Sequence, residues 1–196
     1  MDKINFIKTF ISQGDYKEKY EHGEMIVRHL GAVLDEKMGA YECYECTVPI
    51  GEYDEGEIQK AFVEFSAKMD ALKLKQAKVD KIAEIAAYDT SGKVNGFILN
   101  GLLVWLDKAT RVGLMNSTTI AKAAGQETTT LWLGGIKLVV DCDKAIQLLS
   151  ALEMYALECF NVTASHKAAV SELKSIEKVE TYDYKSGYPK MLEMSV

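Results

Sequence analysis

Arginine, proline and long apolar runs are scarce in this chain of 196 residues, which has 2 prolines and whose only arginines are Arg28 and Arg111. Its lysines alternate with Glu and Asp along the chain, and the net charge is −6. A surface that binds nucleic acid gathers Lys and Arg on one face, and Arg is favoured for forked contacts with phosphate. The sequence therefore predicts no nucleic-acid partner.

No stretch approaches the roughly 18 consecutive apolar residues that a membrane-spanning helix requires. The opening residues Met1–Ile4 also lack the basic, apolar and small-residue order of a signal peptide. We therefore expect no membrane insertion and a protein that is made in a cytoplasm. With 48% hydrophobic and 27% charged residues, the chain has the composition of a globular protein with a buried core.

The four cysteines Cys43, Cys46, Cys142 and Cys159 raise the question of a zinc or redox site. A structural zinc site takes four ligands in closely spaced pairs, and only Cys43 and Cys46 form such a pair. The alternating pattern of Tyr41–Val48 predicts a strand, which places these two cysteines on opposite faces. We therefore expect reduced thiols, no metal and no cofactor.

Residues 1–56 are predicted to form an N-terminal α+β segment. Apolar spacing favours a short helix over Ile4–Ile11 and a second helix within Tyr20–Leu34. The strand over Tyr41–Val48 and a loop over Pro49–Gly56 complete the segment. The acidic residues of this loop lack the spacing of a calcium-binding loop, and their place before a helix explains them.

Residues 57–88 contain no proline or glycine and are predicted to form one long connecting helix. Apolar residues recur along it in alternating steps of three and four, which is the pattern of a coiled-coil seam. The seam consists of Phe62, Phe65, Met69, Leu72 and Val79, with Gln76, Ala83 and Ala86 as its weaker positions. The helix either packs within its own domain or is a stalk for self-association. We favour the stalk and expect a homo-oligomer.

Two β-hairpins are predicted beyond this helix. The first turn is Asn100-Gly101, and an Asn-Gly pair between apolar runs is the strongest short hairpin signal. The second turn is Gly134-Gly135, with β-branched and aromatic residues on both arms. We expect the two hairpins to join in a four-stranded antiparallel sheet.

Two helices are predicted around the second hairpin. Asp107 is expected to cap a helix over Lys108–Ala124 that Gly125 ends. Asp143 is expected to cap a longer helix with an apolar stripe along one face. His166 lies on this stripe, where a hydrogen-bonded core histidine is the expected role.

These elements predict an α+β fold class. A long connecting helix, residues 57–88, follows the N-terminal segment, residues 1–56. The small C-terminal domain, residues 89–196, consists of two antiparallel β-hairpins packed on helices.

Four short blocks follow one another in the C-terminal half: Trp105–Arg111, Thr128–Trp132, Leu152–Ala156 and Tyr182–Tyr184. Their order and spacing resemble an uncharacterised domain family of phages and prophages, common in gut Bacteroidales phages and found near tail-fibre genes. The resemblance covers residues 80–192. It implies a virion or virion-assembly protein, located in the virion and, during assembly, in the host cytoplasm. It assigns no catalytic or binding residue.

The favoured hypothesis is a non-enzymatic structural or adaptor protein of the phage tail or tail fibre. It would act in assembly or in docking a receptor-binding part, with other virion or tail-fibre proteins as partners. Its aromatic anchors, if exposed, are Trp105, Trp132, Tyr182, Tyr184 and Tyr188. Both tryptophans lie inside predicted strands, so we expect them to be buried in the core.

Two other functions stay open. A tail-fibre assembly chaperone, absent from the finished particle, needs an exposed apolar groove, whereas an adaptor buries such surface in a symmetric interface. A small glycan-acting enzyme needs two carboxylates at a set separation. The candidate acids are Asp54, Glu55, Asp107 and Glu153, and the sequence does not pair them. We expect Asp107 to cap the helix and to form an ion pair with Arg111 on the same helix turn. We also expect that the protein is not an enzyme.

Overall fold

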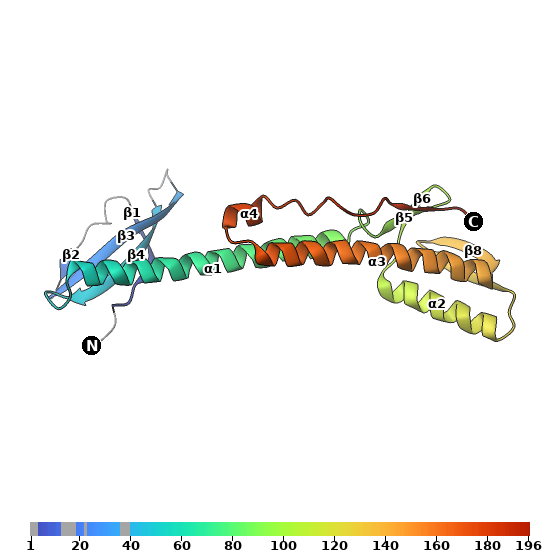
Figure 1. Cartoon of the computed structure of the whole chain (residues 1–196), viewed down its shortest axis with the longest axis horizontal. Helices are drawn as coiled ribbons and strands as arrows, with labels where there is room; N and C mark the ends of the chain where they lie inside the picture. The colour runs from blue at the N-terminus through green and yellow to red at the C-terminus, as the bar shows by residue number, and fades with distance from the viewer. Residues whose placement is uncertain (1–3, 13–18, 22, 36–39) are drawn as a thin grey trace. The chain divides into compact units, whose positions relative to one another are not determined.

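The computed structural model describes residues 4–12, 19–21, 23–35 and 40–196. The chain divides into two compact units, Met1–Lys73 (unit 1) and Leu74–Val196 (unit 2). Figure 1 labels their helices and strands and colours the chain from its N-terminus to its C-terminus. The predicted α+β class, with a long helix followed by hairpins and helices, is confirmed. The limits 1–56, 57–88 and 89–196 stay a prediction, because the long helix contributes residues to both units.

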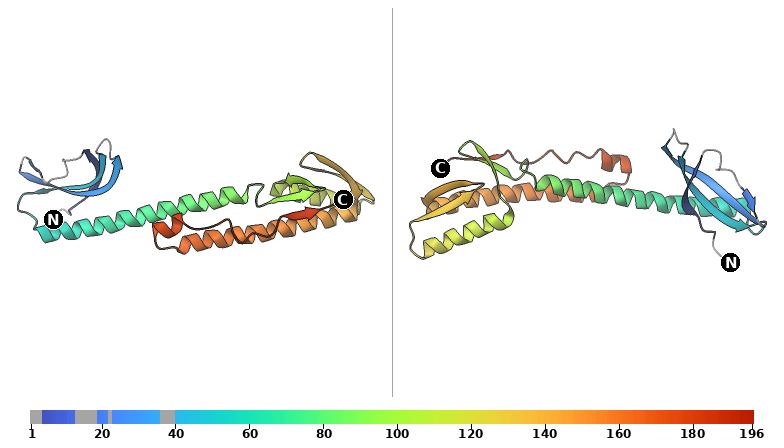
Figure 2. Two further views of the ribbon diagram at one scale, coloured as in Figure 1. Left: turned by 90° about the horizontal axis from the view of Figure 1, so that it is seen from above. Right: turned by 180° about the vertical axis from the view of Figure 1, so that it is seen from behind.

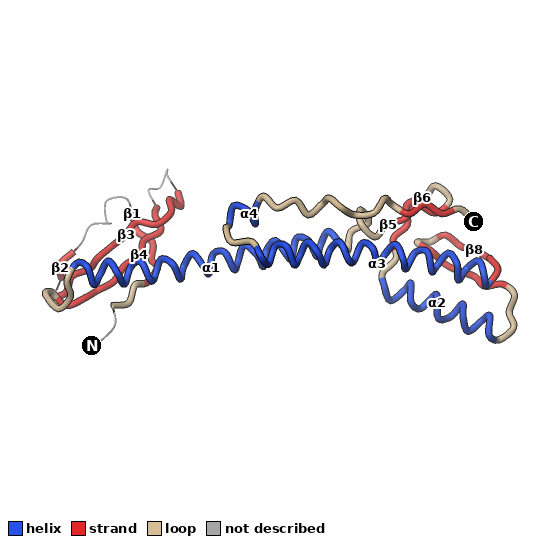
Figure 3. Tube along the Cα trace, in the orientation of Figure 1, coloured by secondary structure: helices blue, strands red, loops and turns tan. Residues whose placement is uncertain are grey.

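Unit 1 contains an antiparallel sheet of four strands in the order β1-β4-β3-β2, shown in red in Figure 3. The strands are β1 (Ile7–Ser12), β2 (Lys19–Glu21), β3 (Glu24–Asp35) and β4 (Ala40–Pro49). The predicted strand over Tyr41–Val48 is confirmed within β4. Among the described residues before Glu55, every regular element is a strand.

The helices predicted over Ile4–Ile11 and within Tyr20–Leu34 are therefore wrong. Both segments pair with β4, which opposes Ile7 with Glu45 and Val27 with Cys46. A short apolar run fits a helical period and an alternating period equally well, so a partner strand decides its structure. That partner comes later in the chain, and local spacing does not reveal it.

One face of this sheet packs on the first turns of the long helix α1 (Glu55–Asp89). Tyr44, Cys46 and Val48 alternate onto that face and form a core cluster with Phe6 and Val27. Helix α1 contributes Ile58, Phe62 and Phe65 to the same cluster. The first two seam residues, Phe62 and Phe65, are thus half-buried against the core of unit 1.

Helix α1 confirms the predicted long helix and begins with a reciprocal cap. The Asp54 carboxylate accepts from the backbone N–H of Glu57 at 2.8 Å, and the Glu57 carboxylate accepts from that of Asp54 at 3.0 Å. This capping box satisfies two N–H groups that an open helix end leaves unpaired. The acidic loop before α1 is therefore used for capping.

Unit 2 adds β5 (Gly96–Leu99), β6 (Leu102–Trp105), α2 (Lys108–Ala123), β7 (Thr128–Leu133), β8 (Ile136–Asp141), α3 (Cys142–Glu172), α4 (Ile176–Glu180) and β9 (Leu192–Met194). Both predicted hairpins are confirmed as β5-β6 and β7-β8. Asn100, Gly101, Gly134 and Gly135 all have positive φ, as their turns require. No helix among the described residues is long and apolar enough to cross a membrane.

The predicted four-stranded sheet is wrong, because the two hairpins belong to different sheets. Strand β9 pairs in parallel with the free edge of β5, which gives the order β6-β5-β9, while β7 and β8 form a sheet of two. Side chains of both sheets share one core with α3, and Figure 2 shows how these elements gather around it.

Both ends of α2 are capped as predicted, whereas α3 does not begin at the predicted cap residue. Asp107 accepts from the backbone N–H of Thr110 at 2.8 Å, and Gly125, with φ of 79°, follows the end of α2. The predicted cap at Asp143 is wrong, since α3 begins at Cys142 and Asp143 lies in its first turn. There the Asp143 carboxylate pairs with Lys122 of α2. An acid in the first turn is favourable to the helix dipole without being the cap.

After α4, residues 181–191 form a return segment that runs back along α3, as Figure 1 and Figure 2 show. His166 of α3 holds this return segment: one ring nitrogen lies 2.9 Å from the Tyr182 hydroxyl and the other 2.9 Å from the Ser186 carbonyl. The predicted hydrogen-bonded role of His166 is thereby confirmed, in a half-buried position. The last described strand, β9, then closes the sheet of β5.

A Gly96→Ala substitution is expected to destabilise unit 2 by about 2 kcal/mol or more, because it overpacks the start of β5. The new Cβ atom would lie 2.1 Å from the Gly92 carbonyl oxygen and 3.2 Å from Leu103. Urea unfolding of the full chain measures the change. Gly113→Ala is the matched control, since its Cβ meets nothing within 4 Å in the middle of α2. It should gain about 0.5–1 kcal/mol, and equal losses for both variants would contradict the packing argument.

Candidate functional site

Both tryptophans lie on the outside of unit 2, so their predicted burial is wrong. Trp105 is 42% exposed and Trp132 is 58% exposed. Trp132 lies between Leu131 and Leu133, whose buried side chains take the inner face of β7. Because successive side chains of a strand alternate between faces, Trp132 must point outward. The same applies to Trp105 next to Val104.

The three tyrosines near the C-terminus are half-buried and hold the return segment. Tyr184 and Tyr188 each meet the ring of Tyr88 edge-on, at centroid distances of 5.6 and 5.7 Å. The Tyr188 hydroxyl also lies 2.9 Å from the Thr163 hydroxyl. Tyr182 is held by His166 as described above. These contacts are internal to unit 2.

A groove of about 430 Å³ lies where the end of β6 and the start of α2 meet α3. Its apolar lining comes from Trp105, Leu106, Ala156, Leu157 and Phe160. Leu106 and Ala156 are buried and form the floor, while Trp105, Leu157 and Phe160 are exposed and form the walls. Phe160, at 61% exposure, is unusually open for a residue of that size.

The ion pair of Arg111 and Glu153 also lines this groove. The Arg111 Nε donates to the Glu153 carboxylate at 2.7 Å, and its second nitrogen donates to the Leu106 carbonyl at 2.7 Å. Arg111 is buried, so it joins α2, α3 and the end of β6. The predicted pairing of Arg111 with Asp107 is wrong. Asp107 instead binds the backbone N–H and the hydroxyl of Thr110, and the hydroxyl contact lowers the Asp107 pKa.

The other end of the groove is polar and holds Asp89, Thr90 and Asn95. The Asp89 carboxylate accepts from the Thr163 hydroxyl at 2.8 Å and more weakly from the Asn95 amide at 3.4 Å. Across the part of the chain that the structure describes, no salt bridge involves Asp89. This carboxylate thus brings negative charge to the groove without a basic partner.

The four acids considered for glycan chemistry fall in two places. Asp107 and Glu153 line the groove, whereas Asp54 and Glu55 belong to unit 1 at the start of α1. Asp107 is occupied as a helix cap and Glu153 by Arg111. What the groove offers chemically is an apolar surface with aromatic walls and, at its polar end, the Asp89 carboxylate.

The cysteines are buried thiols without a disulfide. Cys43 and Cys46 lie on opposite faces of β4, and burial raises the Cys46 pKa to about 11 and the Cys43 pKa in the same direction. Residues 4–12, 19–21, 23–35 and 40–196 contain no group of three His, Cys, Asp or Glu side chains placed to hold a metal ion.

Unit 1 contains a buried carboxylate, Glu42 on β4, at the edge of its core. The ammonium groups of Lys8 and Lys73 pair with it, and the Tyr44 hydroxyl donates to it at 3.2 Å. Burial disfavours the charged form, but these three partners outweigh burial and hold the Glu42 pKa below its ordinary value of 4.5. Sequence reasoning missed this cluster, since Lys8 and Lys73 lie far from Glu42 along the chain.

The lowered pKa predicts how the stability of unit 1 depends on pH. A carboxyl group with a lowered folded pKa stabilises the fold above its unfolded pKa, and that stabilisation is lost as the pH falls through the folded value. Glu42→Gln should therefore be clearly less stable than the natural chain at neutral pH, and the gap should narrow below the ordinary value of 4.5. Urea unfolding across this pH range measures the gap. Glu64→Gln, at an exposed position of α1, is the control. A gap for Glu42→Gln that stays constant with pH would contradict the charge effect.

Comparison with known families finds a match for the C-terminal part of the chain. The family described as Domain of unknown function (DUF4376) matches residues 76–186, which is more than half of the chain and lies within unit 2. No curated protein and no solved structure matches the chain.

Proposed function

The chain belongs to the family described as Domain of unknown function (DUF4376), and on this premise we propose that it is a non-enzymatic structural or adaptor protein of a phage tail or tail fibre. It joins the virion after assembly in the host cytoplasm and docks a receptor-binding part. The phage setting rests on the resemblance of the four sequence blocks.

The observation that carries the proposal is the apolar surface exposed on unit 2. The exposed residues include Leu102, Leu103, Trp105, Trp132, Val139, Met154, Leu157 and Phe160. Single exposed apolar side chains are normal, but Trp105, Leu157 and Phe160 line one groove together. At protein interfaces a few residues contribute most of the binding free energy, and Trp is enriched among them. A docking function explains why they stay outside the core.

An assembly chaperone is the second candidate, and the groove is the observation that favours it. A chaperone holds an apolar segment of another protein for a time, so it keeps an open apolar groove in its free state. An adaptor of the finished particle covers the same surface permanently. The two functions therefore differ in whether the chain remains in the particle.

Purified particles of the phage that encodes the chain provide the direct test. Quantitative mass spectrometry is expected to find the chain at a constant ratio to the tail-fibre protein. A Trp105→Ser variant should be incorporated about tenfold less or worse, because an aromatic anchor at an interface contributes about 2 kcal/mol or more. Ile120→Ser, an equally apolar exposed site on α2 outside the groove, should be incorporated normally.

Two other outcomes are informative. Recovery of the chain in lysate complexes with the fibre protein, but not in particles, would replace the adaptor by the chaperone. Absence from both particles and complexes would overturn the proposed function.

Self-association through α1 is part of the proposal. Phe62 and Phe65 pack against the core of unit 1 and Met69 is half-buried, so the exposed large apolar residues left for the seam are Leu72 and Val79. Lying seven positions apart, these two share one side of the helix. We expect light scattering of the full chain to give the mass of an oligomer, and Leu72→Glu combined with Val79→Glu to reduce it to that of the monomer.

Val63→Glu is the matched control for this experiment. Val63 is exposed on the same helix, but it precedes Leu72 by nine positions, which at about 100° per residue places it on the opposite side. Its mass should equal that of the natural chain. A monomeric natural chain would remove the seam from the proposal and leave α1 as an intramolecular element.

A further inference from the structure

We propose that the groove of unit 2 binds a basic, apolar segment of the partner protein: an aliphatic or aromatic side chain enters between its walls, and a neighbouring Lys or Arg meets the Asp89 carboxylate at its polar end. This inference rests on the proposed docking function and adds the chemistry of the partner.

The apolar part of the proposal follows from how the groove is built. Leu157 and Phe160 lie one turn apart on α3, and Trp105 faces them from the end of β6. The buried Leu106 and Ala156 beneath them give the groove an apolar floor. Its volume of about 430 Å³ lies within the range of pockets that bind drug-sized ligands, so the groove has room for one or two side chains of a partner segment. Covering these walls removes large apolar surface from water, which favours binding.

The basic part follows from the charges of the lining. Three acids line the groove, namely Asp89, Asp107 and Glu153, against two bases. One of the bases, Arg111, is buried and uses its nitrogens on Glu153 and the Leu106 carbonyl. A second base, Lys108, is exposed at the start of α2. Since Arg111 is paired with Glu153 and Lys108 directly follows Asp107, the three acids and two bases leave one negative charge, which we assign to Asp89 at the polar end of the groove. The whole chain is negative as well, with a net charge of −6.

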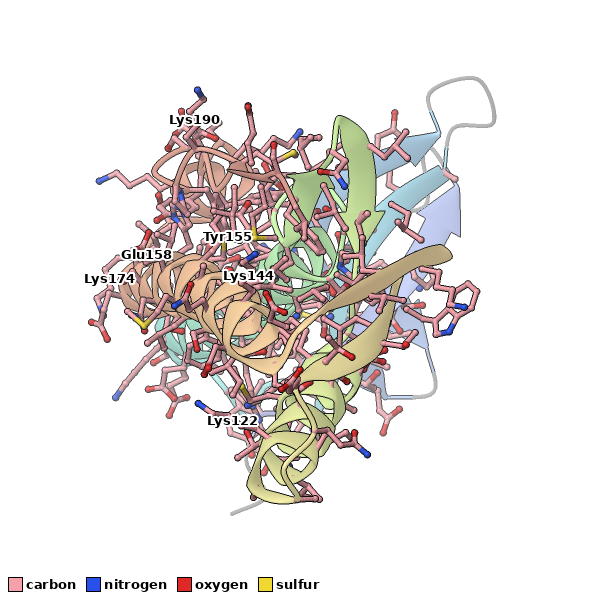
Figure 4. All side chains as sticks on the ribbon, turned by 90° about the vertical axis from the view of Figure 1, so that its right-hand side faces the viewer. Lys122, Lys144, Tyr155, Glu158, Lys174 and Lys190 are labelled. Carbon is pink, nitrogen blue, oxygen red and sulfur yellow. The ribbon has the colours of Figure 1, made fainter. Side chains whose placement is uncertain are left out.

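The aromatic walls favour the same partner. A Lys or Arg cation placed over an indole or phenyl face is attracted by the ring, and Trp is the best such ring. Trp105, Phe160 and Asp89 line the same groove, so a Lys or Arg of the partner would be attracted both by an aromatic ring and by the carboxylate. Several labelled basic side chains of unit 2, such as Lys174 and Lys190, extend at the periphery in Figure 4 and lie outside the groove lining.

Tryptophan fluorescence gives a direct measurement, because the chain has 2 tryptophans. In a full-length Trp132→Phe chain, the emission reports Trp105 alone. The probe is a short acetylated peptide of Leu, Phe and Lys, which is free of Trp and Tyr. Its twin carries Glu in place of every Lys. Titration with the Lys peptide should shift the Trp105 emission to the blue and saturate, and the Glu peptide should bind at least about tenfold more weakly.

Paired variants in the same background locate the site. Phe160→Ala and Asp89→Asn should each weaken binding of the Lys peptide by about threefold or more. Asn at position 89 keeps an oxygen for the Thr163 hydroxyl, so this variant removes charge while leaving that contact possible. The controls are Met154→Ala and Glu158→Gln, at exposed positions of α3 outside the groove lining, and both should bind as the parent does.

Equal affinity for the two peptides, or equal losses in the groove variants and their controls, would overturn the inference. If the Lys peptide fails while the chain still enters particles, the proposed function stands and the partner has another chemistry. If the peptide binds as expected but the chain is found neither in particles nor with the fibre protein, the groove chemistry stands and the proposed function fails.

Discussion

The inner face of α3 is the constraint on which the rest of unit 2 depends. Leu149, Leu152, Tyr155 and Cys159 are buried along it and contact both sheets. The Tyr155 hydroxyl at 2.6 Å and the Cys159 thiol at 3.3 Å both donate to the carbonyl of Val94, which lies just before β5. Burial raises the pKa of both groups, so each keeps its proton and its role as a donor at neutral pH. The start of the first hairpin is fixed in this way.

This arrangement also explains why a groove exists. Since one side of α3 is filled by the core, the apolar residues on its other sides remain at the surface. An amphipathic surface helix normally carries polar residues there, whereas α3 carries Met154, Leu157 and Phe160. The buried Arg111 pairs with Glu153 beside them and sets the start of α2 against α3. Two contacts therefore fix the elements that line the groove. The buried face of α3 packs in the core of unit 2, and the Arg111–Glu153 ion pair joins α2 to α3.

Local chemistry predicted much of this fold. The backbone preferences of Asn100-Gly101 and Gly134-Gly135 were enough to predict both hairpin turns. A long run without proline or glycine was enough to predict α1. Features that depend on distant partners were not predictable in this way. Strand β9 has only three residues and pairs with β5, which lies far earlier in the chain. The apolar spacing of β1 also fits a helix, and its pairing with β4 decides the structure. Trp105 and Phe160 line the same groove, but they lie 55 positions apart and only the tertiary fold of unit 2 brings them together. The outward direction of Trp132 could have been predicted, because its neighbours Leu131 and Leu133 are both apolar and successive side chains of a strand alternate between faces.

The parallel pairing of β5 with β9 affects the order in which the chain can fold. Phe97 pairs with Leu192, so the inner strand of this sheet waits for a segment that the ribosome makes much later. Until then, β5 has a partner on one edge only, and an open edge can pair with other chains. Contacts so distant in sequence form slowly. Nascent unit 2 thus passes through a period in which β5, the central strand of this sheet, has an unprotected edge, and fast synthesis of the segment that contains β9 or a protein that covers this edge would shorten the exposure.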